Sequence, residues 1–383
     1  MATIEVPPLI EILAEIPDPR QSQGRRHSLA SMLALACVAT LCGYQRLMAI
    51  AEWGQNYGEE YKEVLGFEKH GYPGQATWYR VFSKVDVEQV EEKLMAWCEK
   101  ILQALQKKKP DQMMGISIDG KTLRGSQRQG AENSHLLSAY VQQIGLVLGQ
   151  VAVEDKTNEI GAIESFLLQL ALNGRVITTD ALLTQQNVAE TIIENGGDYV
   201  LPVKRNQELT YAAIERWFAE PAPYELPNNS VEYTEKSNGR LTRWHLEAST
   251  ALNDYLDWRG LQQVFKITRT VIYTKTGEKK TDIHYGISSL TPQQADDFTL
   301  LTFKRGYWGI ENSLHWVRDV TFDEDRSVIR VGQTHHLMAI LRNIAISLLR
   351  LSGHTQIATT LRYFAAQPQH AMTLVINPVS IGE

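Results

Sequence analysis

The sequence predicts a mixed α/β fold, in which a helical N-terminal region precedes a mixed sheet with helices on its faces and a β-rich insertion. Three observations lead to this prediction. Apolar residues recur at helical spacing through the first 110 residues, β-branched segments alternate with helical ones from Met113, and longer strand-like segments begin near residue 220. The predicted parts are 1–110, 111–219, 220–292 and 293–383, of which the second and fourth form one core interrupted by the third.

The first 110 residues are expected to form a series of helices. Pro7-Pro8 precede the first helix, and an apolar run over 28–42 gives the second. Short helices are expected over 46–57 and 75–85, followed by a long amphipathic helix from Val87 to the lysines at 107–109. Two arginines before the apolar run resemble the start of an export signal. The run is too short to span a bilayer and follows a long charged stretch, so we expect a buried helix.

Composition indicates an ordinary globular protein. Hydrophobic residues make up 43% and charged residues 21% of the 383 residues, and the formal net charge is -6. This acidic average does not exclude a nucleic-acid partner, because binding needs a basic patch rather than a basic mean. Cys37, Cys42 and Cys98 show no CxxC spacing, which favours buried thiols over disulfides or a zinc site. We therefore expect a cytoplasmic protein.

The second part reads as three strands followed by helix, strand, helix and strand. Strands are expected over 113–120, 134–143, 146–154, 175–180 and 198–204, and helices over 163–172 and 185–195. This is the element order of a ribonuclease-H-like core, in which a three-strand meander leads into a mixed sheet. The insertion is expected to be antiparallel, with turns at Asn238-Gly239 and Thr276-Gly277. Helices are expected to resume over 292–303, 305–320 and 335–352.

Two aspartates follow strands that should be neighbours in such a core. Asp119 ends the first strand and Asp180 the fourth, and Glu311 lies in a helix after the insertion. Two strand-end aspartates and a helix glutamate can hold two divalent cations about 4 Å apart, which suits phosphoryl transfer. Oxygen-only ligands favour Mg²⁺ or Mn²⁺ over zinc. The alternative is that each aspartate is a turn or helix-capping residue, as Asp180 would be if it capped the segment behind it.

Polar side chains near these acids are candidate DNA contacts. Lys121 follows Asp119 by two residues, and Lys204, Asn206 and Gln207 lie just after the fifth strand. Basic and amide side chains in such positions commonly hold the phosphate backbone in register. The alternative for each is an ordinary solvated loop.

Four segments around these residues resemble a known family: "SIDGKTLRGS", "ITTDALLTQ", "YVLPVKRNQ" and "YWGIENSLHWVRDVTFDED". They look like the signature blocks of the H-repeat-associated (ISAs-type) transposases, bacterial insertion-sequence enzymes of the DDE superfamily. The resemblance extends in order over nearly the whole chain. It implies a helical N-terminal DNA-binding region, a ribonuclease-H-like core with a β insertion, and a catalytic, metal-binding triad at Asp119, Asp180 and Glu311.

The segment that carries Glu311 departs from the pattern of the wider superfamily. That pattern has Tyr seven residues before the glutamate, Arg four before and Lys seven after, where this chain has Lys304, Tyr307 and Arg318. A basic residue is kept only at the last position, so a role for Tyr307 is in doubt. On an α-helix, three- and four-residue steps would place Glu311, His315 and Arg318 on one face. This spacing predicts that His315 and Arg318 contact phosphates.

The function predicted from the sequence is that of a DDE transposase. It would use two Mg²⁺ or Mn²⁺ ions to hydrolyse phosphodiester bonds at the ends of an insertion sequence and to join those ends to target DNA. The expected partner is double-stranded DNA, both terminal repeats and target, bound by two copies of the chain in association with the nucleoid. The alternatives are a stand-alone ribonuclease-H-like nuclease, which would need neither the insertion nor the N-terminal helices, and a domesticated DNA-binding protein.

Overall fold

The computed structural model describes residues 6–123, 134–153, 159–219, 229–237, 239–327, 329 and 331–379. Its contacts divide the chain into two compact units. Unit 1 comprises Met1–Gln112, Gly120–Lys156 and Glu311–Glu383, and unit 2 comprises Met113–Asp119 and Thr157–Ile310. Strand β1 (Met114–Leu123) contributes its first half to unit 2 and its end to unit 1.

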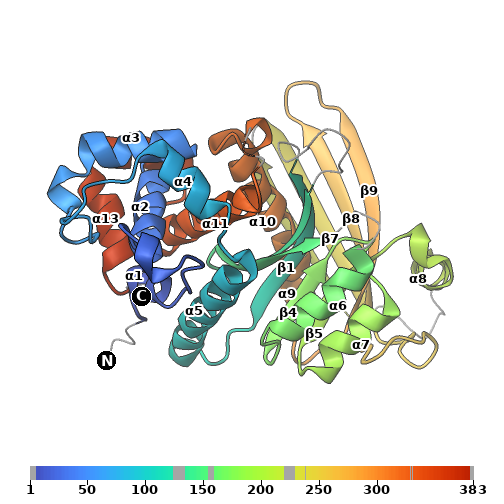
Figure 1. Ribbon diagram of the computed structural model, residues 1–383. Helices are drawn as coiled ribbons and strands as arrows, with labels where there is room; N and C mark the ends of the chain where they lie inside the picture. The colour runs from blue at the N-terminus through green and yellow to red at the C-terminus, as the bar shows by residue number, and fades with distance from the viewer. Residues whose placement is uncertain are drawn as a thin grey trace. The chain divides into compact units, whose positions relative to one another are not determined.

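Unit 1 is built around the apolar helix α2. Its helices are α1 (Leu9–Ala14), α2 (Leu29–Leu41), α3 (Leu47–Tyr57), α4 (Gln75–Phe82), α5 (Val87–Lys108), α11 (Thr334–Leu351), α12 (Ile357–Ala366) and α13 (Pro368–Ile376). Helix α2 is buried on nearly every side and contacts α1, α3, α11 and α13 (Figure 1). This confirms the buried helix predicted for the apolar run. The N-terminal helices share one core with the C-terminal helices, so we do not expect residues 1–110 to fold alone.

The strands of unit 1 are β2 (Ser134–Val141) and β3 (Leu146–Val153), which pair antiparallel around Gly145. Gly145 has a φ of 70°, which favours glycine, as the predicted turn requires. Helices α5 and α11 both pack against β3. Among the described residues, none of the helices is long and apolar enough to cross a membrane. The three cysteines, Cys37, Cys42 and Cys98, are buried free thiols.

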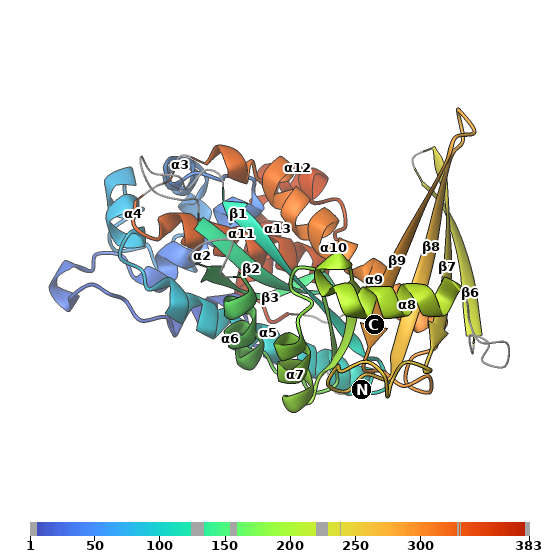
Figure 2. The same cartoon turned by 90° about the vertical axis from the view of Figure 1, so that its right-hand side faces the viewer.

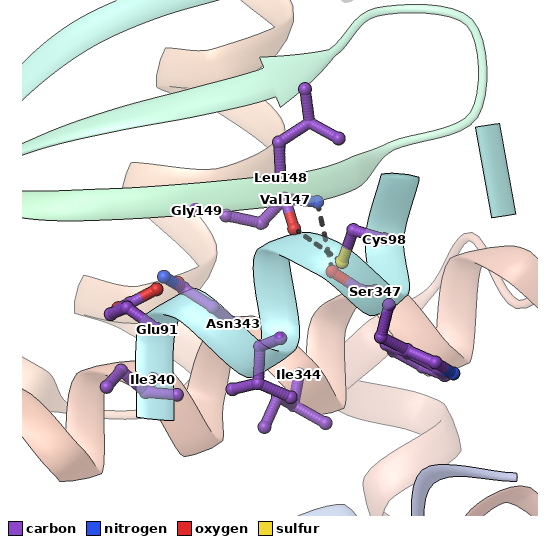
Figure 3. Close-up of a pocket in the computed structure, with 11 residues that line it drawn as sticks. Glu91, Cys98, Val147, Leu148, Gly149, Ile340, Asn343, Ile344 and Ser347 are labelled. Atoms are coloured by element: carbon purple, nitrogen blue, oxygen red, sulfur yellow. Dashed lines mark hydrogen bonds between the residues drawn. The ribbon is translucent and has the colours of Figure 1, made fainter. Parts of the chain in front are cut away.

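A small cavity of about 20 Å³ lies where α5, β3 and α11 meet (Figure 3). Its walls are mostly apolar, with polar side chains from Glu91, Asn343 and Ser347, and Ser347 Oγ accepts a hydrogen bond from the Val147 N–H at 3.0 Å. Burial raises the pKa of Glu91 to about 8, against the lowering effect of its hydrogen bonds with Gln150 and of the Arg318 charge. The cavity can hold about one water molecule. It contains none of the predicted site residues.

In unit 2 the hydrogen-bonded strand order is β1-β4-β5-β9-β8-β7-β6. Strands β4 (Arg175–Thr179) and β5 (Asp198–Val203) run parallel to β1, and in unit 1 the order β3-β2 leads to the end of β1. The order β3-β2-β1-β4-β5 confirms the predicted ribonuclease-H-like core within a mixed α/β fold. The helices of unit 2 are α6 (Glu159–Gln169), α7 (Gln186–Glu194), α8 (Glu208–Ala219), α9 (Asp297–Gly306) and α10 (Trp308–Ile310).

The insertion extends the sheet of unit 2 with four long antiparallel strands (Figure 2): β6 (Asn229–Ser237), β7 (Arg240–Ser249), β8 (Gln263–Tyr273) and β9 (Lys279–Ser288). Strand β9 pairs with β5. Phe265 and Ile267 pack in one cluster with α9, whereas Lys266 between them lies over Phe218 of α8. Because side chains alternate along a strand, α8 and α9 cover opposite faces. Asn238 and the predicted start of the insertion, residues 220–228, lie outside the described residues.

Candidate active site at the ends of β1 and β4

Asp119 and Asp180 follow the last paired residues of two parallel neighbours. The β1–β4 register ends with Ile118 opposite Thr179, so the next residue on each strand is an aspartate. Both carboxylates are half-buried. The two aspartates are therefore adjacent in unit 2 where the β1–β4 pairing ends, although β1 continues to Leu123 and does not end at Asp119 as the sequence predicted. The sequence reasoning therefore correctly placed these two acids side by side.

The Asp180 carboxylate has a raised pKa. Burial is the largest influence and raises its pKa, and the charges of Asp119 and Glu159 raise it further. The Leu183 backbone N–H, which donates to Asp180 Oδ1 at 2.9 Å, and the charge of Lys204 lower the pKa but do not outweigh these effects. Asp180 thus makes the turn contact that the alternative interpretation expected. The effect of this contact on the pKa is smaller than that of burial.

Glu159 is an acid of this cluster that the sequence reasoning missed. It lies in the first turn of α6 and is 5% exposed, and its charge acts on Asp180. An acidic residue in a first helical turn is common because the helix dipole favours it there, so no sequence pattern distinguishes Glu159 from an ordinary helix residue.

Three predicted DNA-binding residues lie after β5, and two of them contact the loop behind Asp180. Asn206 Nδ2 donates to the carbonyl of Ala181 at 2.7 Å, and Gln207 Nε2 donates to the carbonyl of Thr184 at 2.9 Å. These amides hold the chain that follows β4. Lys204 is exposed and close enough to Asp180 to lower its pKa. Of the three, Lys204 is the best placed to meet a phosphate.

Glu311 lies in a segment of unit 1 that is π-helical rather than α-helical. The π-helical turns span Glu311–His315 and Val317–Thr321. In a π-helix the hydrogen bonds run from residue i to i+5, so the α-helical steps used for the shared face do not apply. Glu311 is exposed, whereas His315 is 9% and Arg318 0% exposed. The expected common face is therefore not formed. Short π-helical turns are rare and occur frequently at functional sites.

Arg318 belongs to a buried ionic cluster of unit 1. Its Nε lies 2.8 Å from Glu324 Oε2, and Arg342 Nη1 lies 3.0 Å from Glu324 Oε1. Burial would raise the pKa of Glu324, but the two guanidinium groups outweigh it and hold the pKa below its usual value. The prediction that Arg318 contacts DNA does not fit this arrangement, because the guanidinium reaches no surface. We call Arg318, Glu324 and Arg342 the ionic cluster.

Lys121 is also enclosed. It is 8% exposed and forms an ion pair with Asp319 in the second π-helical turn. This pair joins the end of β1 within unit 1 to the segment that follows Glu311. Lys121 thus contacts the π-helical segment and His315 lies within it. Both side chains are buried, so a phosphate would reach either only after local rearrangement.

The acids of the strand-end cluster suit a hard divalent cation. Asp119, Asp180 and Glu159 offer only carboxylate oxygens, the ligands that Mg²⁺ and Mn²⁺ prefer. Burial, and to a smaller extent the charges of Asp119 and Glu159, raise the pKa of Asp180, and a bound cation would favour its charged form. Among the described residues, however, no group of three or more His, Cys, Asp or Glu side chains already has a metal-binding arrangement.

Comparison with known proteins identifies the family of this chain. Residues 10–98 match the family described as "DDE_Tnp_1-associated", and residues 110–348 match the "Transposase DDE domain". The chain belongs to this DDE transposase family.

Its relatives in Escherichia coli strain K12 include "H repeat-associated putative transposase YhhI", 33% identical over 356 residues that cover 90% of this chain and 91% of that protein. "H repeat-associated putative transposase YbfD" is 34% identical over 63% of this chain and 94% of its own length. These matches confirm the resemblance to H-repeat-associated transposases. A piggyBac transposase synaptic complex with hairpin DNA aligns at a TM-score of 0.39 and 9% identity, over 95% of this chain and 76% of that one, which is too distant to support an argument.

Proposed function

We propose that this transposase cuts and joins DNA at the ends of an insertion sequence through Asp119, Asp180 and Glu311. The observation that carries the proposal is that two acids, Asp119 and Asp180, lie side by side where the pairing of β1 with β4 ends. Clustered acids of which one has a raised pKa are common at sites that bind a ligand. Glu311 is included because it matches the glutamate of the family motif and is exposed in a π-helical turn.

In this proposal Asp119 and Asp180 bind divalent metal directly, with Glu311 as the third acid. Two bound Mg²⁺ or Mn²⁺ ions would supply stabilisation of the attacking and leaving oxygens of an in-line displacement. Lys204 holds a neighbouring phosphate and so fixes the scissile bond in register. Asn206 and Gln207 keep the loop after Asp180 in place through their bonds to Ala181 and Thr184. Two copies of the chain bind the two element ends and the target duplex.

A cleavage and joining assay on duplex DNA that carries the sequences flanking the coding region tests the proposal. Asp119→Asn, Asp180→Asn and Glu311→Gln should each lower cleavage by at least about 10²-fold, as expected when a group that stabilises transition-state charge is removed. The matched control is Asp198→Asn, because Asp198 begins β5 at the other end of the parallel strands and accepts a hydrogen bond from Ser289 Oγ at 2.8 Å. Near-normal cleavage by any triad variant would remove that residue from the mechanism. Cleavage without joining would indicate a nuclease.

A further inference from the structure

Tyr307 places its hydroxyl group against one of the proposed metal-binding acids. Tyr307 Oη donates a hydrogen bond to Asp119 Oδ1 at 2.9 Å, within unit 2. The tyrosine is only 5% exposed, so the phenol is held by its surroundings. Its backbone N–H donates to the carbonyl of Phe303, which places Tyr307 at the C-terminal end of α9.

The end of α9 lies over the face of β1 that carries Asp119. Ser117 and Asp119 are two residues apart and so point to the same face of the strand. Ser117 Oγ lies 3.5 Å from the carbonyl of Gly306, next to Tyr307. On the same face, Met113 packs against a core cluster that contains the α9 residues Leu300, Leu301 and Phe303. Contacts along the strand therefore fix the position of Tyr307 before any ligand binds.

A hydrogen bond to a carboxylate oxygen sets the plane in which the carboxylate presents its lone pairs. Carboxylates that bind metals are commonly held in this way, and losing the partner typically weakens metal binding or activity by about 10 to 100-fold. A buried phenol is well suited to this role because it has few rotatable bonds and cannot itself compete as a charged ligand while it remains protonated.

We infer that Tyr307 is a positioning residue that orients the Asp119 carboxylate for the divalent cation. The inference rests on the proposed function and adds a residue to it. It also gives a role to the position four residues before Glu311, where this chain departs from the superfamily pattern. In this chain the residue at that position, Tyr307, donates its hydrogen bond to Asp119.

The test uses the full-length protein and Mn²⁺ as the probe. Thermal melts over a range of Mn²⁺ concentrations give the midpoint of metal-dependent stabilisation without an activity measurement. Tyr307→Phe should raise this midpoint by about 10-fold or more, and cleavage should recover at high Mn²⁺. The matched control is Tyr211→Phe, because Tyr211 Oη contacts Glu215 Oε1 at 3.3 Å on the exposed surface of α8. The control should leave the midpoint unchanged.

A second variant keeps the ring and restores a donor. Replacing Tyr307 with 4-aminophenylalanine supplies an N–H group that can donate to Asp119, so its Mn²⁺ midpoint should return toward that of the unmodified protein. An unchanged midpoint in Tyr307→Phe, or no recovery in the 4-aminophenylalanine variant, would overturn the inference while leaving the proposed function intact. Absence of any Mn²⁺ response in the unmodified protein would count against the proposed function itself.

Discussion

The ionic cluster of unit 1 and the acids beside the β1–β4 pairing of unit 2 both contain buried or half-buried carboxylates, but the charges around these carboxylates have opposite signs. In the ionic cluster, Glu324 is 3% exposed and lies between two buried guanidinium groups, whose charges hold its pKa low. At the strand ends, Asp180 is half-buried beside Asp119 and Glu159, and its pKa is raised. Burial acts in the same direction on both carboxylates.

The difference lies in the sign of the neighbouring charges. An enclosed acid with cationic partners is complete and contributes to the architecture. An enclosed acid with anionic neighbours and a raised pKa is a candidate binding residue. By this criterion Arg318 is a structural residue although its position in the sequence suggested DNA contact, and we propose that Asp180 belongs to a binding site although it also holds a turn.

Removing the negative charge of the ionic cluster should have the largest effect on stability. Glu324→Gln leaves two buried arginines without their counter-charge and should lower the free energy of unfolding by about 3 to 5 kcal/mol. Urea unfolding of the full-length protein measures the change. The control is Arg326→Gln, because the side chain of Arg326 is 83% exposed in its pair with Asp323 and should contribute less than about 0.5 kcal/mol. Similar losses in the two variants would mean that the ionic cluster does not stabilise the fold.

Glu91 is a third case in this comparison. Burial raises its pKa more than the Gln150 hydrogen bonds and the Arg318 charge lower it, so its carboxyl group is protonated below about pH 8. Burial raises its pKa from 4.5 to about 8. A raised folded-state pKa gives stability that is complete below pH 4.5 and is lost as the pH rises through 8. Relative to Glu91→Gln, the wild-type protein should lose up to about 1.4 kcal/mol per pH unit within this window.

Thermal melts of both proteins between pH 5 and pH 9 measure this difference, with the exposed neighbour Glu92→Gln as the control. A constant difference between wild type and Glu91→Gln across the range would show that Glu91 is ionised in the folded protein.

Smaller effects on stability and DNA affinity should distinguish a structural role from a DNA contact for the residues after β5. Asn206→Ala removes the bond to the Ala181 carbonyl and should destabilise the protein by about 0.5 to 1.5 kcal/mol. Its DNA affinity should keep the same salt dependence. Lys204→Ala should leave stability unchanged and reduce the slope of log affinity against log salt by about 1. Anisotropy titrations at several salt concentrations give both slopes, and a reduced slope for Asn206→Ala would make Asn206 a DNA contact after all.

The sequence predicted what depends on local pattern and strand order. The β-branched run of β4 and the helical spacing of α5 lie within a few residues of their predicted ranges, and strand order placed Asp119 beside Asp180. The ionic cluster depends on residues up to 24 positions apart, from Arg318 to Arg342, which only the tertiary fold brings together. The π-helical geometry around Glu311 has no pattern of its own in the sequence, and α-helical spacing was assumed for it. The domain boundaries and the catalytic roles remain predictions.

Thermal melts of wild type and Asp180→Asn, each with EDTA and with Mn²⁺, test the central claim that the strand-end acids form a metal site. Asparagine keeps an oxygen that can accept from the Leu183 N–H, so the turn contact survives while the charge is removed. Wild type should gain stability with Mn²⁺, about 2.7 kcal/mol at a hundredfold excess over Kd. Asp180→Asn should be more stable than wild type in EDTA and respond little to Mn²⁺. A variant that is less stable in EDTA and responds to Mn²⁺ as wild type does would show that Asp180 is only a turn residue, and would contradict the account.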